Sequence, residues 1–232
     1  MPKRRLQDKN FIWTPQLAYA VGLLVTDGNL SKDGRHITMR SSEVELLDSF
    51  KNCLGLGNKI GFTEGQRGYR VQFGNIQFYN WLLKIGLFPA KTYTIGKINV
   101  PDLYFRDFLR GHLDGDGSIL AYVDNYNVYK GRRYENQRIF VRFISASQNH
   151  MIWLRQRIEK LADIHGALIF RKPPTENRVP IWELKFAKKE SLQLIDWIYY
   201  KPDIPCLERK RMVAENAVKI ISKQKRREYA KI

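Results

Sequence analysis

The chain has 232 residues, enough for one large domain or two small ones, and a hydrophobic content of 44% that can supply real cores. No apolar run approaches the roughly 18 residues that a membrane-spanning helix needs, so we expect no membrane partner. The two cysteines, Cys53 and Cys206, lack metal-ligand spacing, which favours a reducing intracellular compartment: the cytoplasm of an archaeon or bacterium, or an organelle.

The charge of the chain indicates a polyanionic partner. Lys and Arg number 40 against 23 Asp and Glu, which gives a formal net charge of +17. Nucleic acid is the leading candidate, because contacts to phosphates release counterions. Charge alone also fits a ribosomal or chromatin protein, so it indicates the class of partner and no more.

The first half of the chain predicts helix, hairpin, helix, hairpin, helix. Residues 1–13 are expected to be a basic arm or, alternatively, the remnant of an organelle-targeting segment. A helix is predicted from the N-cap Thr14 to Asp27, with Gly28 as its stop. The elements predicted after it are a hairpin around Asp33-Gly34 (30–40), a helix (42–56), a second hairpin (58–63 and 69–73) and a helix (76–87).

Polar residues in these hairpins alternate with apolar ones, which predicts a sheet with one cationic face. Such a face suits base edges and phosphates, although a solvated sheet face would show the same pattern. The candidates for nucleic-acid contact in this half are Asn29, Ser31, Arg35, Thr38, Arg40, Lys59, Arg70 and Gln72.

Residues 88–101 are predicted to connect the halves, and the second half repeats the order with a longer first hairpin. The predicted elements are a helix from Pro101 to Asp116 with Gly117 as its stop, strands at 118–128 and 138–145, a helix at 148–163, strands at 167–172 and 181–187, and a helix at 190–200. A final basic helix, roughly 207–229, is expected to dock through Val213, Ala217, Ile220 and Ile221.

The second half also carries candidates for DNA contact. Arg can pair with guanine and Asn or Gln with adenine, so a mixture of these groups with aromatic residues suits base reading. Lys130, Arg132 and Arg133 fall at the expected hairpin tip, where we expect phosphate contacts or simply a mobile basic loop. The remaining candidates are Tyr122, Asn125, Arg138, Arg142, Arg171, Lys172, Arg178, Glu183 and Lys185.

One pattern occurs twice, as AVGLLVTDG at 20–28 and LRGHLDGDG at 109–117. Small residues four apart on each predicted helix would let the two helices pack closely. In a parallel pair, Asp27 and Asp116 meet at C-terminal ends, where the helix dipole is negative and like charges repel. A divalent cation relieves both penalties, and carboxylate ligands favour Mg²⁺ over zinc. Alternatively, these are two core helices closed by ordinary Asp-Gly turns.

At these residues the chain resembles the LAGLIDADG homing endonucleases. Residues 109–117 match the nine-residue signature of that family at five positions and depart from it at four. The first copy is looser but keeps the Gly, the small residue before the acid and the Asp-Gly pair. The resemblance covers most of the chain. It implies an α+β fold of two pseudo-symmetric αββαββα halves, 14–100 and 101–232, each with a four-stranded antiparallel DNA-binding sheet, packed through paired motif helices.

The resemblance also implies an active centre. Asp27 and Asp116 would bind two or three Mg²⁺ ions, with Mn²⁺ or Ca²⁺ as substitutes for binding, and the carbonyls of Thr26 and Gly115 would complete the ligand shell. Lys91 would be one central lysine, although it could be an exposed linker residue, and Lys210 the other. We expect Asp114 to affect the metal at most indirectly, through the residues that bind it. We expect His112 to be a hydrogen-bonded packing residue.

The function implied is site-specific, metal-dependent cleavage of both strands of DNA. The chain would act as a monomer on a long asymmetric target and promote the mobility of its host intron or intein. Two alternatives stay open: a maturase that binds its own intron RNA, and a cleavage-inactive DNA-binding protein on the same fold. Retention of both Asp27 and Asp116 argues against the second.

Overall fold

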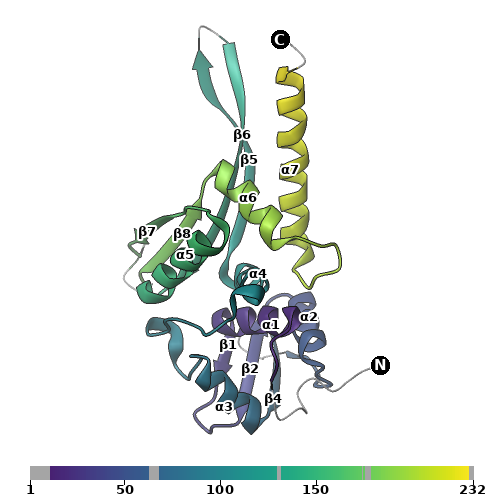
Figure 1. Cartoon of the computed structure of the whole chain (residues 1–232), viewed down its shortest axis with the longest axis vertical. Helices are drawn as coiled ribbons and strands as arrows, with labels where there is room; N and C mark the ends of the chain where they lie inside the picture. The colour runs from purple at the N-terminus through teal and green to yellow at the C-terminus, as the bar shows by residue number, and fades with distance from the viewer. Residues whose placement is uncertain (1–10, 63–67, 130–131, 174, 176–178, 230–232) are drawn as a thin grey trace.

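The structure is a computed structural model that describes residues 11–62, 68–129, 132–173, 175 and 179–229. The chain forms two units of the same order, each with three helices and four strands (Figure 1). The first unit comprises α1 (Pro15–Thr26), β1 (Gly28–Leu30), β2 (His36–Ser41), α2 (Val44–Leu54), β3 (Gly61–Phe62), β4 (Tyr69–Gly74) and α3 (Ile76–Lys84).

The second unit is followed by one additional long helix. It comprises α4 (Phe105–Asp116), β5 (Ser118–Tyr129), β6 (Arg132–Ser145), α5 (Gln148–Ala162), β7 (Ala167–Arg171), β8 (Ile181–Phe186) and α6 (Lys188–Ile198), and α7 (Glu208–Tyr229) comes after it. Two short 3₁₀ helices, Lys91–Tyr93 and Asp102–Tyr104, lie in the connector between the units. The predicted fold of two αββαββα halves is therefore confirmed.

Each unit has one antiparallel sheet with the same strand arrangement. The sheet orders are β1-β2-β4-β3 and β5-β6-β8-β7, so the two hairpins of each unit pair through their second strands. Helices α1 and α4 lie together at the centre of the molecule between the two sheets (Figure 1). The β5–β6 ribbon extends beyond the body, and α7 runs alongside it.

Helices α1 and α4 pack with their backbones in close approach. Thr14 caps α1 by accepting a hydrogen bond from the Leu17 amide at 3.1 Å, and Pro15 occupies the first turn. A Cβ at Gly111 would collide with the Tyr19 carbonyl oxygen and lie 3.2 Å from Gly22 Cα. A Cβ at Gly22 would collide with the Phe108 carbonyl oxygen in turn. The two glycines therefore permit a helix contact that no larger residue allows.

The predicted stops at Gly28 and Gly117 are glycines for a different reason than we expected. A helix-stop glycine usually adopts a left-handed conformation, but Gly117 is extended with φ of −86°. A Cβ at Gly28 would lie 2.5 Å from the Leu24 carbonyl oxygen, and one at Gly117 would lie 2.7 Å from the Leu113 carbonyl oxygen. Both glycines allow the chain to turn tightly from a motif helix into a strand.

Several predicted bounds were wrong by a few residues. Helix α4 begins at Phe105 because residues 102–104 form a 3₁₀ turn, and α3 ends at Lys84, just before Gly86 takes a positive φ of 101°. Strand β6 begins at Arg132, so Arg132 and Arg133 belong to the ribbon, and not to its tip as predicted.

Helix α7 docks through a different stripe from the one predicted. Ala217 and Ile221 are buried as expected, but Val213 and Ile220 are 39% and 46% exposed. The buried stripe runs instead through Leu207, Lys210, Ala214, Ala217 and Ile221. Its spacing of three to four residues is that of one helix face, which turns Lys210 into the protein. Among the described residues, no helix is long and apolar enough to cross a membrane.

Candidate active site

The two motif acids lie at the same end of the helix pair. Asp27 caps the C-terminus of α1, and Asp116 is the last residue of α4. Gly111 faces Tyr19 and Gly22, while Gly115, one turn later, faces Thr26 and Asp27. The contact advances in the same direction along both helices, so the helices are parallel. A Cβ at Gly115 would lie 2.7 Å from Asp27 Oδ2. The Asp27 carboxylate therefore lies beside the residue that directly precedes Asp116 in the chain.

Both carboxyls are harder to ionise than usual. Burial, and then the negative charge of Asp116, raises the pKa of Asp27 from 3.8 to about 6. Asp116 is more exposed than Asp27, yet desolvation by the surrounding protein also raises the pKa of Asp116. The positive charges of Lys91 and Lys210 oppose this rise. Thr26 Oγ1 donates to Asp27 Oδ2 at 3.3 Å and favours the ionised form. The site therefore concentrates negative charge that the protein solvates poorly.

Two buried lysines flank the acids in equivalent positions. Lys91 Nζ donates to the carbonyl oxygen of Gly28, and Lys210 Nζ donates to that of Gly117 at 2.7 Å. Gly28 follows Asp27 directly as Gly117 follows Asp116, so each lysine binds the residue after one acid. Lys91 and Lys210 are 8% and 5% exposed, which rules out an exposed linker position for Lys91.

The surroundings of the two lysines differ in one respect. Lys210 Nζ also donates to the carbonyls of Leu113 and Asp114 at 2.7 and 2.8 Å and lies 3.4 Å from that of Gly115, and so closes the C-terminus of α4. Burial lowers the pKa of Lys91 to about 8, although the charges of Asp116 and Asp27 oppose this shift. Burial also lowers the pKa of Lys210, and the negative charge of Asp114 is the main effect that opposes this shift.

The outer face of the first sheet collects the predicted polar residues in rows. Strand register puts Thr38 between Asn29 and Gln72, and puts Arg40 beside Arg70. Asn29, Arg40, Arg70 and Gln72 are exposed, as are Arg35 and Lys59 outside these rows, and Ser31 is partly exposed. Thr38 is only 6% exposed because longer neighbours cover it on both sides, so its contact with nucleic acid stays a prediction with little exposed surface behind it.

The outer face of the second sheet is crossed by ion pairs. Glu183 is 5% exposed and pairs with Arg171 at 2.7 Å and with Arg142 at 3.5 Å, so it is a buried counter-ion here, and its predicted contact with DNA stays a prediction. Arg138 pairs with Asp124 at 3.2 Å. These arginines are held in place by the carboxylates, which leaves part of their charge already neutralised.

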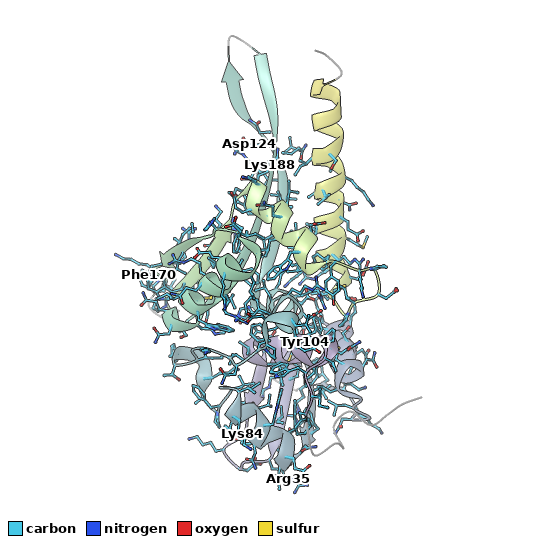
Figure 2. The ribbon with its side chains drawn as sticks, viewed as in Figure 1. Arg35, Lys84, Tyr104, Asp124, Phe170 and Lys188 are labelled. Atoms are coloured by element: carbon cyan, nitrogen blue, oxygen red, sulfur yellow. The ribbon has the colours of Figure 1, made fainter. Side chains whose placement is uncertain are left out.

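Other predicted contacts of this sheet mix cationic and apolar groups. Lys185 Nζ lies 4.1 Å from the centre of the Phe140 ring, and Tyr122 is 46% exposed beside that ring. Lys172 is exposed just after β7. Figure 2 shows Arg35 and Asp124 on opposite sides of the central helix pair, one in each unit. Lys130 and Arg178 lie outside the described residues, as do the side chains of Asn125, Arg132 and Arg133.

The solved structures that share this fold include LAGLIDADG homing endonucleases. The chain superposes on I-LtrWI bound to its target DNA with a TM-score of 0.62 at 14% identity, covering 90% of this chain and 91% of that one. It superposes on I-SmaMI bound to uncleaveable DNA with a TM-score of 0.60 at 12% identity, covering 94% and 93%. The chain has the LAGLIDADG homing endonuclease fold.

The fold also occurs in a protein with a different name. Full-length DUF199/WhiA from Thermatoga maritima matches with a TM-score of 0.52 at 13% identity, over 97% of this chain and 72% of that one. No protein-family model matches the sequence, and no curated protein sequence matches it. These likenesses therefore show the LAGLIDADG fold and no more.

The donor set at the helix ends fits Mg²⁺. No group of three or more His, Cys, Asp or Glu that could hold a metal occurs among the described residues. The protein offers two carboxylates and nearby backbone carbonyls, including that of Gly115. Mg²⁺ suits such a set, because it commonly takes one or two carboxylates and keeps water or phosphate as its other ligands.

The motif carboxylate Asp114 has a role that the sequence did not indicate. It is 2% exposed, and its Oδ2 accepts hydrogen bonds from the Tyr19 hydroxyl and the Leu207 amide, both at 2.8 Å. Leu207 immediately precedes α7, which carries Lys210. Asp114 thus ties the start of α7 to both motif helices. Its partners lie more than 90 residues away in the chain, and no local pattern predicts such contacts.

Arg110 reinforces the same junction. Its guanidinium is fully buried and donates to the carbonyls of Pro205 and Ile198, both at 2.8 Å, and to Asp107 at 2.7 Å. Asp107, Arg110 and Asp114 recur at spacings of three and four, which puts them on one face of α4. That face holds the segment between α6 and α7 in place.

Proposed function

We propose that this chain is a site-specific, metal-dependent endonuclease that cuts both strands of double-stranded DNA. The observation that carries the proposal is the juxtaposition of Asp27 and Asp116 at the ends of two parallel helices, each beside a buried lysine. Structural proteins have no need of two adjacent, poorly solvated carboxylates, whereas phosphodiester hydrolysis needs bound cations. The resemblance to the homing endonucleases adds to this proposal a role in the mobility of a host intron or intein.

Asp27 and Asp116 would hold Mg²⁺ in this proposal, with the carbonyls of Thr26 and Gly115 as further ligands. Bound Mg²⁺ supplies charge stabilisation at the scissile phosphate and at the leaving oxygen. Lys91 and Lys210 hold positive charge at the two sides of the site, where they stabilise the added negative charge as water attacks phosphorus. The two equivalent acids suit one cut in each strand.

The DNA would lie across the outer faces of both sheets. The exposed rows of the first sheet carry Arg40, Arg70 and Gln72. The second sheet carries Arg138, Arg142 and Lys185 on its two central strands, and Lys185 pairs with Arg142 as Gln72 pairs with Thr38 in the first sheet. Two sheets of different sequence on one chain favour a long asymmetric target and a monomeric enzyme.

A cleavage assay tests this proposal directly. The protein is incubated with Mg²⁺ and a duplex made by joining the sequences that flank its own coding insertion. We expect a double-strand cut, which Asp27→Asn and Asp116→Asn abolish while DNA binding in Ca²⁺ stays largely intact. Unimpaired cutting by either variant would contradict the assignment of the metal ligands.

The same assay separates the alternatives. No cleavage, but tight and salt-sensitive binding of the intron transcript, would identify a maturase. No cleavage with specific duplex binding would identify a DNA-binding protein that has the fold without the activity. The second outcome matters because the DUF199/WhiA structure shares the fold under a name that states no nuclease activity.

A further inference from the structure

The connector between the two units is bound along its length to helix α5. Ser147 Oγ donates to the Ile95 carbonyl at 2.5 Å, and His150 Nδ1 donates to the Gly96 carbonyl at 2.7 Å. Further along, Arg157 Nη2 donates to the Val100 carbonyl at 2.9 Å. The connector is therefore fixed to the second unit, although its residue Lys91 binds Gly28 of the first unit.

Lys91 is one short turn from these anchor points. The Lys91 carbonyl accepts hydrogen bonds from the Thr94 and Ile95 amides at 3.0 and 2.8 Å. The residue whose amide completes this turn, Ile95, is the residue whose carbonyl Ser147 binds. A shift of residues 95–96 therefore moves the backbone of Lys91, whose ammonium reaches across to Gly28.

The hydrogen bonds fix the proton positions of a buried histidine pair. The Gly96 carbonyl can only accept, so His150 carries its proton on Nδ1 and its Nε2 is an acceptor. His112 Nε2 lies 3.1 Å from His150 Nε2 and must donate to it. Both rings are at most 1% exposed, and burial lowers the pKa of His150 to about 4 and that of His112 well below its usual value. Both imidazoles are thus neutral, as this chain of donors requires.

We propose that His150, oriented by His112 of the motif helix α4, is a positioning residue that sets Lys91 at the active site through the Gly96 carbonyl. The inference rests on the proposed endonuclease function for its catalytic consequence. It assigns a role to two buried histidines that ligand binding and DNA contact do not use. It also makes the position of Lys91, which binds the first unit at Gly28, depend on helix α5 of the second unit.

A purely structural role predicts a different behaviour from a positioning role. Loss of a buried hydrogen bond lowers the stability of the whole protein in either case. Only the positioning role predicts that Lys91 is released selectively, while Lys210 stays buried. Arg157 provides the matched control, because it binds the same connector from the same helix but nine residues beyond Lys91.

The first test measures the labelling rate of Lys91 by an amine-reactive ester at fixed pH, by mass spectrometry of the free protein. Lys210 in the same sample reports global opening. We expect His150→Leu to raise the Lys91 rate, relative to that of Lys210, by about three- to tenfold, the equivalent of one lost hydrogen bond. His150→Asn keeps a donor near the Nδ1 position and should restore the wild-type ratio, and Arg157→Leu should leave it unchanged. An unchanged ratio in His150→Leu overturns the proposal.

The second test follows single-turnover cleavage at saturating DNA. His150→Leu should lower the cleavage rate with little change in the dissociation constant, and it should have no further effect when Lys91 is already Ala. Equal loss of rate in the wild-type and Lys91→Ala backgrounds would contradict positioning. If no variant cleaves any duplex but the labelling ratio shifts as expected, the endonuclease proposal fails and the positioning of Lys91 stands.

Discussion

Asp27 carries a carboxylate that the folded protein accommodates poorly when it is ionised. Its pKa of about 6 in the folded state lies above the ordinary value of 3.8, so the folded protein binds a proton there more tightly than the unfolded chain does. The stability that this site contributes is therefore lost as pH rises from about 4 through 6. In metal-free protein at neutral pH, Asp27 is a destabilising residue.

We predict that Asp27→Asn stabilises the metal-free protein. At pH 8 in EDTA the gain in unfolding free energy should be about 1–3 kcal/mol, reduced from the full shift because the carboxyl retains some solvent. Urea unfolding at pH 8 and at pH 4 measures it. The gain should vanish at pH 4, where the wild-type carboxyl is largely protonated in the folded state. A variant that is less stable than wild type at pH 8 would show that the site does not penalise the charge.

Divalent metal provides the counterpart of this prediction. Ca²⁺ or Mg²⁺ should raise the unfolding midpoint of the wild-type protein at pH 8, because a ligand that binds only the folded state stabilises it. Asp27→Asn should lose most of that response. An equal response in both proteins would place the metal at another site.

The sequence identified the acids and lysines of this site but not the residues that hold them. Asp27 and Asp116 are visible as a repeated pattern, and the resemblance to the homing endonucleases indicated Lys91 and Lys210 in the segments after each unit. Tyr19, His150 and Arg110 act through partners more than 35 residues away, and their types are common in any core. The burial of Thr38 and Glu183 depends on their neighbours across the sheet, which a single strand does not reveal.

At the level of elements, the contact between α1 and α4 depends on glycine at two positions. A Cβ at Gly111 would meet the backbone of Tyr19, which cannot rotate away as a side chain could. We predict that Gly111→Ala forces the helices apart and lowers the unfolding free energy by about 1–3 kcal/mol or more, the usual range for overpacking. It should also lower cleavage, because the acids at the ends of the two helices separate. Chemical denaturation and single-turnover cleavage measure the two effects.

Gly61→Ala is the matched control for this substitution. Gly61 lies in β3, and a Cβ there would meet nothing within 4 Å. Its stability should stay within about 0.5 kcal/mol of wild type, as for an ordinary surface substitution. If both variants lose the same stability, then close backbone approach is not the reason for glycine at 111.

Element order was largely predictable, whereas element ends and docking faces were not. Periodicity and turn residues predicted the α-helices and strands in order, because each follows from local pattern, but not the two 3₁₀ turns of the connector. Helix α7 shows the limit. Its sequence offers apolar residues on two faces, and the buried stripe is the one that turns Lys210 toward the carbonyls of α4. A tertiary contact, and not the local pattern, selects that face.

At the scale of the whole molecule, ion pairs within the protein reduce the part of the formal charge of +17 that is available to bind DNA. On the second sheet, Arg138, Arg142 and Arg171 already face carboxylates within the protein. Neutralised arginines release fewer counterions on binding DNA. We therefore expect the salt dependence of binding to reflect fewer phosphate contacts than the number of exposed basic residues suggests.

This expectation can be tested with two exposed residues of the first unit. Lys59 is a cation just before β3, and Gln72 is a neutral residue in the row that Asn29 and Thr38 share. If Lys59 contacts a phosphate, Lys59→Ala should weaken binding of all duplexes alike and reduce the slope of log K against log salt by about 1. Gln72→Ala should keep that slope and instead relax preference at particular base pairs, because an amide reads base edges without releasing counterions. Fluorescence anisotropy with matched and mismatched duplexes in Ca²⁺ measures both. A slope unchanged by Lys59→Ala would show that the DNA does not contact this edge of the first sheet. A uniform loss of affinity in Gln72→Ala would show that the row contacts the DNA backbone and not base edges.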